Sequence, residues 1–191
     1  IKYIAYYIIT FIILISFPLN ATAQIEISTI EELQKIGDDP AYPLDGDYYL
    51  TNDIDATETR NWNDGKGFEP IAEKYNDFTG SFDGCNYVID GLYIKRPGKR
   101  FAGLFASTFR ATVKNVIMKN VYIHGNYNTG ALCGDGVNYF NCHIYGVVRG
   151  EDRTGGIVGV GYKIEDCSFF GKVSGNNDVG GLVGSGGNIT D

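Results

Sequence analysis

Neighbouring carboxylates are the first residues in this sequence whose types and spacing suit chemistry. Asp53 and Asp55 are two positions apart, so in a strand both side chains project from one face. The adjacent Glu165 and Asp166 point to opposite faces. Two carboxyl groups on one face can act as acid and base in glycoside hydrolysis. All four residues adjoin turn signals, where aspartate is common for structural reasons, so we predict no catalytic residue from them.

Patterns for metal and phosphate binding are equally sparse. His124 and His143 lie too far apart to form the HExxH helix with which zinc peptidases bind metal and activate water. Acidic loops at 45–55 and 61–64 offer oxygen ligands but lack EF-hand spacing, so calcium binding stays open. The glycine runs lack the lysine and following helix of a phosphate loop. We expect no catalytic, cofactor-binding or metal-binding residue and no cofactor.

The four cysteines, Cys85, Cys133, Cys142 and Cys167, show no CxxC spacing of the kind used for zinc or redox chemistry. Cys142 and Cys167 take the same place in the sequence repeat described below, which is typical of a small buried hydrophobe. Four cysteines in an exported chain also allow three disulfide pairings. Free thiols and disulfides both remain open at this point.

The charge balance narrows the class of partner. The chain carries 23 acidic and 16 basic residues, for a net charge of −7. An acidic surface repels phosphate backbones, so we expect no nucleic-acid partner. There is no polybasic run that would attract an anionic membrane, and we expect no membrane span in the mature chain.

A repeat of 25 residues organises the second half of the chain and would position any functional side chain. Residues 129–134 (TGALCG) recur at 154–159 (TGGIVG) and 179–184 (VGGLVG), with a looser copy at 102–105. Apolar columns share the step: Leu104, Leu132, Ile157 and Leu182; Val113, Tyr139, Ile164 and Ile189; Val116, Cys142 and Cys167; Ile123, Val148 and Val173. A polar column of Asn115, Asn141, Asp166 and Asp191 runs beside them. Such periodicity indicates stacked repeats.

The repeat units read as strands, because short alternating segments rich in Val, Ile, Phe and Tyr stand between glycines. A 25-residue unit matches one coil of a parallel β-helix, with equivalent residues roughly 4.8 Å apart in neighbouring coils. We therefore predict an all-β fold, a parallel β-helix or β-solenoid with coils of about 25 residues. We expect glycines at corners with positive φ, and the Asn/Asp column at a bend.

The N-terminal part is expected to cap this stack. Residues 28–36 predict a short helix with Ser28 or Thr29 as N-cap, a glutamate three residues later, and Gly37 as its end. We assign 24–100 to this cap and to irregular first coils, and 101–191 to the regular repeats. Because Asp191 falls in the middle of a repeat, we expect the natural protein to continue beyond it.

Residues 1–23 have the pattern of a secretory signal peptide. A positive Lys2 precedes an uncharged apolar run over 4–17, and small residues at 21 and 23 suit a cleavage site. The run is about 14 residues long, shorter than the roughly 20 needed to cross a bilayer. We expect export, with cleavage after Ala23, and a secreted or cell-surface location.

The repeats resemble those of GLUG-motif proteins, named for a Gly-Leu-x-Gly core. That core stands at 181–184 (GLVG), with a close variant at 156–159 (GIVG), while 131–134 (ALCG) departs at its first glycine. Residues 48–55 and 78–89 look like the leader that often precedes such repeats. The resemblance implies an exported bacterial β-solenoid, as in filamentous-haemagglutinin-like adhesins and in N-terminal regions of immunoglobulin A-cleaving zinc metallopeptidases.

Taken together, the sequence favours a non-catalytic extracellular surface or adhesion-type module, with a host-surface protein or glycan as partner. Tyr122, Tyr145 and Tyr127 are predicted to project outward, where a tyrosine offers rigid area and a hydroxyl for binding. Two alternatives stay open. One is the N-terminal, non-catalytic region of a larger secreted zinc metallopeptidase, and the other is a carbohydrate-active β-helix.

Overall fold

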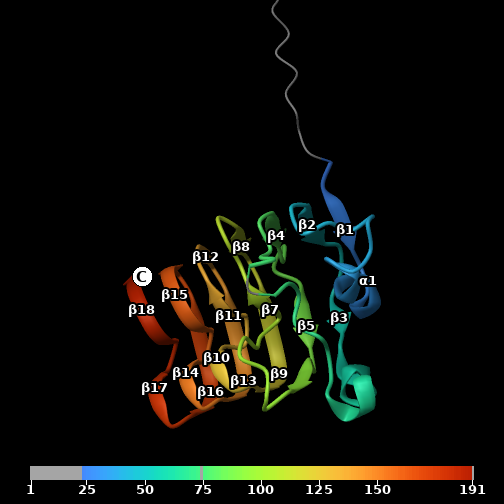
Figure 1. The fold of residues 1–191 in the computed structure, drawn as a ribbon. Coiled ribbons are helices and arrows are strands. Elements are labelled where there is room, and N and C mark those ends of the chain that lie inside the picture. Colours follow the sequence, from blue (N-terminus) through green and yellow to red (C-terminus); the bar gives the residue numbers. More distant parts are fainter. Residues whose placement is uncertain (1–22, 74, 191) are drawn as a thin grey trace, which may run out of the picture.

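The computed structural model describes residues 23–73 and 75–190, which form a β-solenoid of about seven turns (Figure 1). The chain winds from helix α1 and strand β1 at one end to strand β18 at the other, so sequence order follows the long axis (Figure 1). This confirms the predicted all-β solenoid. The predicted signal peptide lies outside the described residues apart from Ala23, and so does Asp191 of the polar column.

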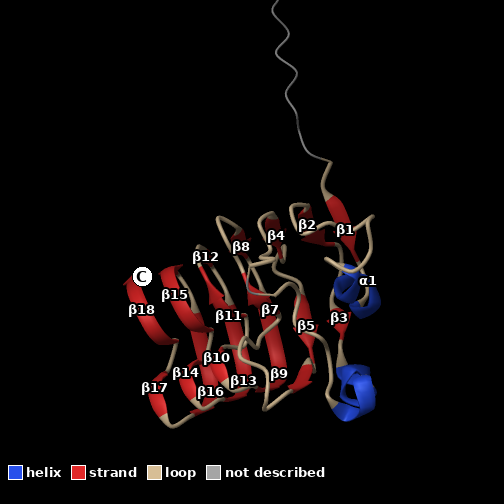
Figure 2. Cartoon of the chain, viewed as in Figure 1, coloured by secondary structure: helices blue, strands red, loops and turns tan. Residues whose placement is uncertain are grey.

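Short strands build the turns, and the described helices are α1 (Ile30–Lys35) and the 3-10 turns η1 (Thr57–Asn61) and η2 (Asn63–Gly65) (Figure 2). The strands of the first turns are β1 (Ile25–Ile27), β2 (Asp47–Leu50), β3 (Ile54–Asp55), β4 (Ser81–Asp83), β5 (Val88–Asp90), β6 (Tyr93–Lys95), β7 (Phe105–Ser107), β8 (Thr112–Lys114) and β9 (Ile117–His124). The later strands are β10 (Tyr127–Thr129), β11 (Cys133–Gly136), β12 (Tyr139–Phe140), β13 (His143–Arg149), β14 (Asp152–Gly155), β15 (Val158–Glu165), β16 (Ser168–Ser174), β17 (Asn177–Gly180) and β18 (Val183–Thr190).

The strands pair in parallel into three sheets that form the walls of the solenoid. The largest runs β1-β2-β4-β8-β12-β15-β11-β7, with β18 beside β15. It makes two walls because β15 turns a corner, pairing with β11 near Val158 and with β12 near Ile164. A second sheet runs β16-β13-β9-β5-β3 with β6 beside β9, and β10-β14-β17 makes the third.

One column of the apolar core can be followed through every turn, with its end members Ile25 and Ile189 partly exposed. Its members pair in succession: Ile25, Tyr48, Phe82, Val113, Tyr139, Ile164 and Ile189. The predicted column from Val113 to Ile189 is therefore confirmed, and it continues back to the first strand. The step in sequence between neighbouring turns is 23 and then 34 near the N-terminus, and it settles to 26 and 25 in the repeats.

The column belongs to a continuous apolar core whose composition changes along the axis. In the first turns large aromatic side chains are fully buried, and the ring centroids of Phe78 and Phe105 lie 4.9 Å apart. In the repeats aliphatic residues such as Leu132, Ile144 and Val148 replace them. Full burial of one such side chain contributes about 1.5–3 kcal/mol, so stacking stabilises each turn through its neighbours.

The expectation that repeat glycines occupy corners with positive φ is wrong for most of them. Of the described glycines beyond residue 100, Gly171 and Gly186 are those with positive φ. Many of the others are required by close approach within the stack: a Cβ on Gly155 would lie 2.1 Å from the carbonyl oxygen of Val158, whereas a Cβ on Gly181 would meet nothing within 4 Å. Glycine here removes a side chain where the chain packs against itself, and conformational freedom is a secondary matter.

Asparagine and aspartate take the left-handed corners instead. Asn115, Asn141 and Asp166 have φ values of 55, 49 and 51°. The side-chain amide of Asn141 donates to Oδ1 of Asn115 at 2.9 Å, and that of Asn115 donates to Oδ1 of Asp83 at 2.9 Å. The predicted bend is thus confirmed for these three members, and the side chains of Asn115 and Asn141 also form hydrogen bonds between turns. Asparagine and aspartate adopt this conformation more readily than other non-glycine residues.

The predicted N-terminal helix is confirmed as α1, which lies at one end of the stack (Figure 1). Thr29 is its N-cap: Oγ1 of Thr29 accepts from the amide of Glu32 at 3.1 Å, and the Glu32 carboxylate accepts from the amide of Thr29 at 3.2 Å. Ile30 and Leu33 are buried in the core. The helix ends before Gly37, whose φ is +89°. No described helix is long and apolar enough to span a membrane.

Candidate functional site: an outward face of the solenoid

The carboxylates singled out in the sequence are used by the fold itself. Oδ1 of Asp53 accepts from the amide of Val88 in the next turn at 2.8 Å. Oδ1 of Asp55 accepts from the amide and the hydroxyl of Thr57 at 2.9 and 2.7 Å, and these donors, the hydroxyl first, lower the pKa of Asp55. Both side chains are exposed, and they hold backbone in place, Asp53 in the next turn and Asp55 locally. A lowered pKa suits a hydrogen-bond acceptor and not a general acid.

The second carboxylate pair also has structural roles. Glu165 lies 3.1 Å from the ammonium of Lys163, and Asp166 occupies a left-handed corner. In the described residues, no group of three or more His, Cys, Asp or Glu side chains is placed to hold a metal ion. Within the acidic loop at 45–55, Oδ1 of Asp47 accepts from the hydroxyl of Ser81 at 2.6 Å.

The four cysteines are free thiols. Burial raises the pKa of Cys133 to about 12, so this thiol is held in its neutral form. Cys142 is fully buried, as expected of a small hydrophobe, and Cys167 lies one turn further on. The amide of Cys142 donates to the sulfur of Cys167 at 3.4 Å. Contact between the two side chains raises the pKa of Cys142 and lowers that of Cys167.

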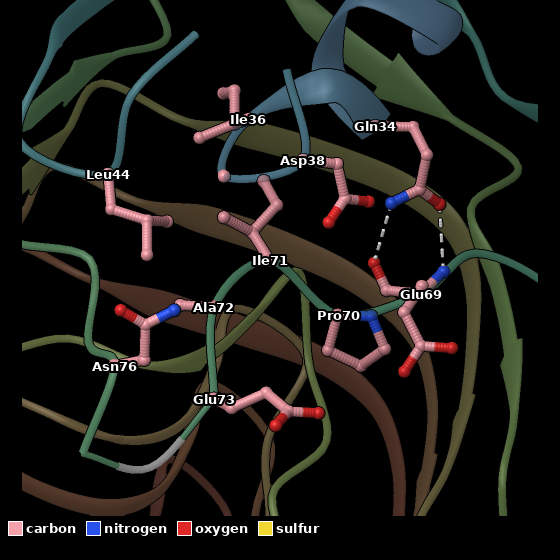
Figure 3. Close-up of a pocket in the computed structure, with 11 residues that line it drawn as sticks. Gln34, Ile36, Asp38, Leu44, Glu69, Pro70, Ile71, Ala72, Glu73 and Asn76 are labelled. Carbon is pink, nitrogen blue, oxygen red and sulfur yellow. Dashed lines mark hydrogen bonds between the residues drawn. The ribbon is translucent and has the colours of Figure 1, made fainter. Parts of the chain in front are cut away.

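A hollow of about 190 Å³ lies between the end of α1 and residues 69–73 and 76 (Figure 3). Ile36, Leu44 and Ile71 supply apolar lining, and acidic side chains stand at its rim. Two hydrogen bonds cross its edge: the Gln34 amide donates to the Glu69 carbonyl at 3.0 Å, and its oxygen accepts from the Glu69 amide at 2.9 Å (Figure 3). This paired contact fixes the capping helix to the next turn, which is a structural role.

The outward face of strands β6, β9, β13 and β16 is chemically different from the rest of the molecule. We call its projecting side chains the cationic strip: Tyr93, Lys95, Lys119, Tyr122, His124, Tyr145, Arg149, Phe170 and Lys172. These four strands contain lysine, arginine and both histidines of the chain but no aspartate or glutamate. A chain with seven net negative charges thus presents one positive face.

Pairing between turns lines these side chains up into ladders. Lys95, His124 and Arg149 occupy one register position in three successive turns, and Tyr93 and Tyr122 share the position two residues before. The Tyr93 and Tyr122 rings stack with centroids 5.1 Å apart and planes 15° apart. Neighbouring strands are roughly 4.8 Å apart, so Lys95 and Arg149 stand roughly 10 Å apart along the axis.

The aromatic rings also hold cations in place. The guanidinium of Arg149 lies 5.8 Å from the ring centroid of Tyr122, and that of Arg60 lies 5.4 Å from that of Tyr93. Such contacts restrict long side chains that would otherwise sample many rotamers. A second stacked pair, Tyr145 and Phe170, has centroids 5.2 Å apart and is 40 and 59% exposed.

His124 is the member of this strip whose environment disfavours a positive charge. Its Nδ1 atom is buried without a hydrogen-bond partner. Burial lowers the pKa of His124, followed by the positive charges of Arg149 and Lys95, and Glu151 acts in the opposite direction. His143, on the same sheet, instead shares hydrogen bonds with Ser168 at 2.8 Å and Asn141 at 3.0 Å.

Sequence reasoning found part of this face. Tyr122 and Tyr145 project outward as predicted, whereas the outward Tyr127 lies in β10 on a different sheet, beneath the guanidinium of Arg100. The ladder of Lys95, His124 and Arg149 was missed. The repeat spacing relates His124 to Arg149, and an alignment of outward columns would have revealed the absence of acidic residues.

Comparisons with known proteins find partial similarities to very long chains. The chain is 41% identical over 115 residues to halomucin of Haloquadratum walsbyi, covering 57% of this chain and 1% of that protein. It is 31% identical over 140 residues to an immunoglobulin A1 protease of Streptococcus sanguinis, covering 71% and 7%. It is 32% identical over 96 residues to a putative Gly-rich membrane protein of Evansella cellulosilytica, covering 46% and 10%.

The matched segments therefore span at most about a tenth of the length of these relatives. No protein-family model matches the chain, so membership of the GLUG-motif family stays a prediction. No solved structure matches it either. The chain is thus similar to short segments of these relatives.

Proposed function

We propose that this chain is a non-catalytic extracellular surface module of the adhesion type, exported by the signal peptide 1–23. The observation that carries the proposal is a continuous solenoid with an exposed face of stacked aromatic rings and cations. The carboxylates considered for chemistry are engaged in hydrogen bonds that hold turns in place. These features favour binding of a host-surface protein or glycan over turnover of a substrate.

The relatives support an extracellular setting. One is named as a membrane protein, and another as a protease of immunoglobulin A1. In the same proposal, residues 24–100 form the cap and irregular first coils, and 101–191 form GLUG-like repeats of a longer stalk. Stacked repeats suit this role because they extend a binding surface without requiring a larger core.

The test is to present the purified chain with surface glycoproteins and a panel of glycans and peptides, measuring retention and cleavage together. The proposal expects saturable retention and intact ligands after prolonged incubation. Cleavage products that form with the native chain and not with a heat-denatured sample would contradict it.

An alternative is the N-terminal, non-catalytic region of a larger secreted zinc metallopeptidase. It is favoured by the alignment with the immunoglobulin A1 protease, which covers 71% of this chain. The test is to sequence the gene beyond Asp191. A downstream domain carrying HExxH supports this alternative, and further repeats leading to an anchoring signal support the surface module.

A further inference from the structure

We propose that the cationic strip binds an extended acidic polysaccharide, one built from uronic acid sugars, laid along the solenoid axis. This inference rests on the proposed extracellular binding function and names its ligand. The relevant observations are the sign of the charge, the spacing of the charges and the polar edges of the aromatic ladders.

The positive charge of the strip indicates a negatively charged ligand. The four strands of the strip contain no carboxylate and carry the cations Lys95, Lys119, Arg149 and Lys172. Many acidic strand residues lie instead on the other walls, such as Asp83, Asp135 and Asp152. Within the same sheet, acidic residues lie in β3 and β5 at its first end, where Asp90 pairs with Lys119. Clustered charge of one sign steers ligands of the opposite sign to that face. The guanidinium of Arg149 can bind a carboxylate through two parallel hydrogen bonds.

Repetition gives the shape of the ligand. Lys95, His124 and Arg149 align in three successive turns, and Ser174 takes this position in the next turn, so the face offers two cations and a histidine at regular intervals along a line. Tyr145 and Phe170 are 40 and 59% exposed, so this part of the strip stands on an open surface. A linear polymer with regularly spaced charges can engage several turns at once, and multiple weak contacts then add up to useful affinity.

The aromatic ladders favour a sugar polymer over an acidic peptide. The Tyr93 and Tyr122 rings stack face to face and both residues are only partly buried, so a ligand along the ladder can reach ring edges. The phenol hydroxyl both donates and accepts hydrogen bonds, which matches the many hydroxyl groups of a sugar. Tyr145 and Phe170 repeat the arrangement one ladder away and expose more of their apolar area.

The inference is tested by measuring the affinity of the immobilised chain for three probes of similar length. The first is a hyaluronan octasaccharide, which alternates uronic acid with a neutral sugar; the second is a neutral chitin-type octasaccharide; the third is a short oligothymidylate with the same number of charges. The expected result is measurable binding of hyaluronan and at least tenfold weaker binding of both other probes.

Paired variants assign the binding to the strip. Lys95→Ser with Arg149→Ser removes two charges from the strip, and we expect affinity to fall on the order of tenfold or more. The matched control is Lys163→Ser with Arg100→Ser, which removes one lysine and one arginine outside the four strands of the strip; both of these cations pack on a ring, as Arg149 does. The control should stay within about twofold of the original chain, because screening weakens distant charges.

The Arg149 side chain also packs on Tyr122, so unfolding of each variant is monitored by circular dichroism. If the double variant does not fold, Lys172→Ser in the exposed strand β16 is the second test, with several-fold weakening expected. Equal loss in the control pair, or equal binding of the oligothymidylate or the neutral sugar, overturns the inference. Retention on other surface glycoproteins would then still leave the proposed adhesion function standing.

Discussion

The two halves of the solenoid reach the same stacked geometry by different means. Up to residue 100 the step between turns is irregular, and large rings such as Phe78 and Phe82 fill the interior. Beyond residue 100 the step is 26 and then 25, aliphatic side chains fill the core, and glycines such as Gly155 let backbones touch. The regular step of the repeats thus depends on glycines that allow close backbone contact as well as on the packing of core side chains.

The largest effect is expected where a glycine is closely covered. A Cβ on Gly156 would lie 2.2 Å from the carbonyl oxygen of Gly181 and 2.4 Å from the ring of Phe169. Gly156→Ala should therefore cost on the order of 3 kcal/mol or more in chemical denaturation, because backbone and ring must both shift. Gly181 occupies the same repeat position one turn later, and a Cβ there would meet nothing within 4 Å, so Gly181→Ala should cost about 0.5 kcal/mol at most. Equal costs would show that close contact does not explain the repeat glycines.

Substitutions in the column from Ile25 to Ile189 compare the core of the aromatic first half with that of the aliphatic repeats. Phe82 is fully buried with its ring 5.6 Å from that of Phe105, so Phe82→Ala should cost about 3–5 kcal/mol. Ile164 belongs to the same column in the repeat half, and Ile164→Ala should cost about 2–5 kcal/mol. Urea denaturation of both variants should show one shared transition. Loss of only the first half in the Phe82 variant would contradict a single cooperative core.

Substitution of the corner residue Asn115, which forms hydrogen bonds with Asp83 and Asn141, should cause a moderate loss of stability, and this loss has two separable causes. Asn115 has φ of 55°, donates to Asp83 and accepts from Asn141. Asn115→Ala removes both hydrogen bonds and places a residue that disfavours positive φ at this corner. We therefore expect the free energy of unfolding, measured by heat or urea, to fall by about 2–3 kcal/mol. Asn115→Gly restores the backbone tolerance alone and should recover part of that loss. No difference between the two variants would mean that φ at this corner carries no strain.

The smallest expected effect is a pH dependence centred on His124. Its pKa is lowered in the folded chain, so below its unfolded value of 6.5 the unfolded state binds more protons than the folded state. Stability from this residue is therefore complete above pH 6.5 and declines as the pH falls toward the folded pKa. His124→Asn should reduce the drop in melting temperature between about pH 7.5 and 5. His143→Asn is the control, and an equal reduction there would contradict the assignment.

The sequence was sufficient for the fold because each repeated column reports a shared environment. The column through Val113, Tyr139 and Ile164 needed only its spacing, and Thr29 with Glu32 marked the start of the capping helix. The role of the glycines was misjudged because the close approach of Gly155 to the carbonyl of Val158 cannot be read from residue type. Glycine at a turn signal fits both positive φ and tight packing equally well.

The candidate site was harder to predict, since its members come from turns with different spacing. Lys95 and His124 become neighbours through the pairing of β6 with β9, in the irregular part of the chain where no repeat aligns them. The outward position of the tyrosines could be predicted from the sequence. The absence of carboxylates from four strands becomes informative only when the structure shows that these strands form one wall. Register between turns was therefore the missing information.

Hydrogen exchange measured by mass spectrometry tests whether both halves form one solenoid. We expect strong and comparable protection of the amides in β2 and β4 and of those in β13, because all lie between paired neighbours in one stack. Rapid exchange of the whole segment 24–100 while the repeats stay protected would argue against a single stack, since the halves would then fold and unfold separately.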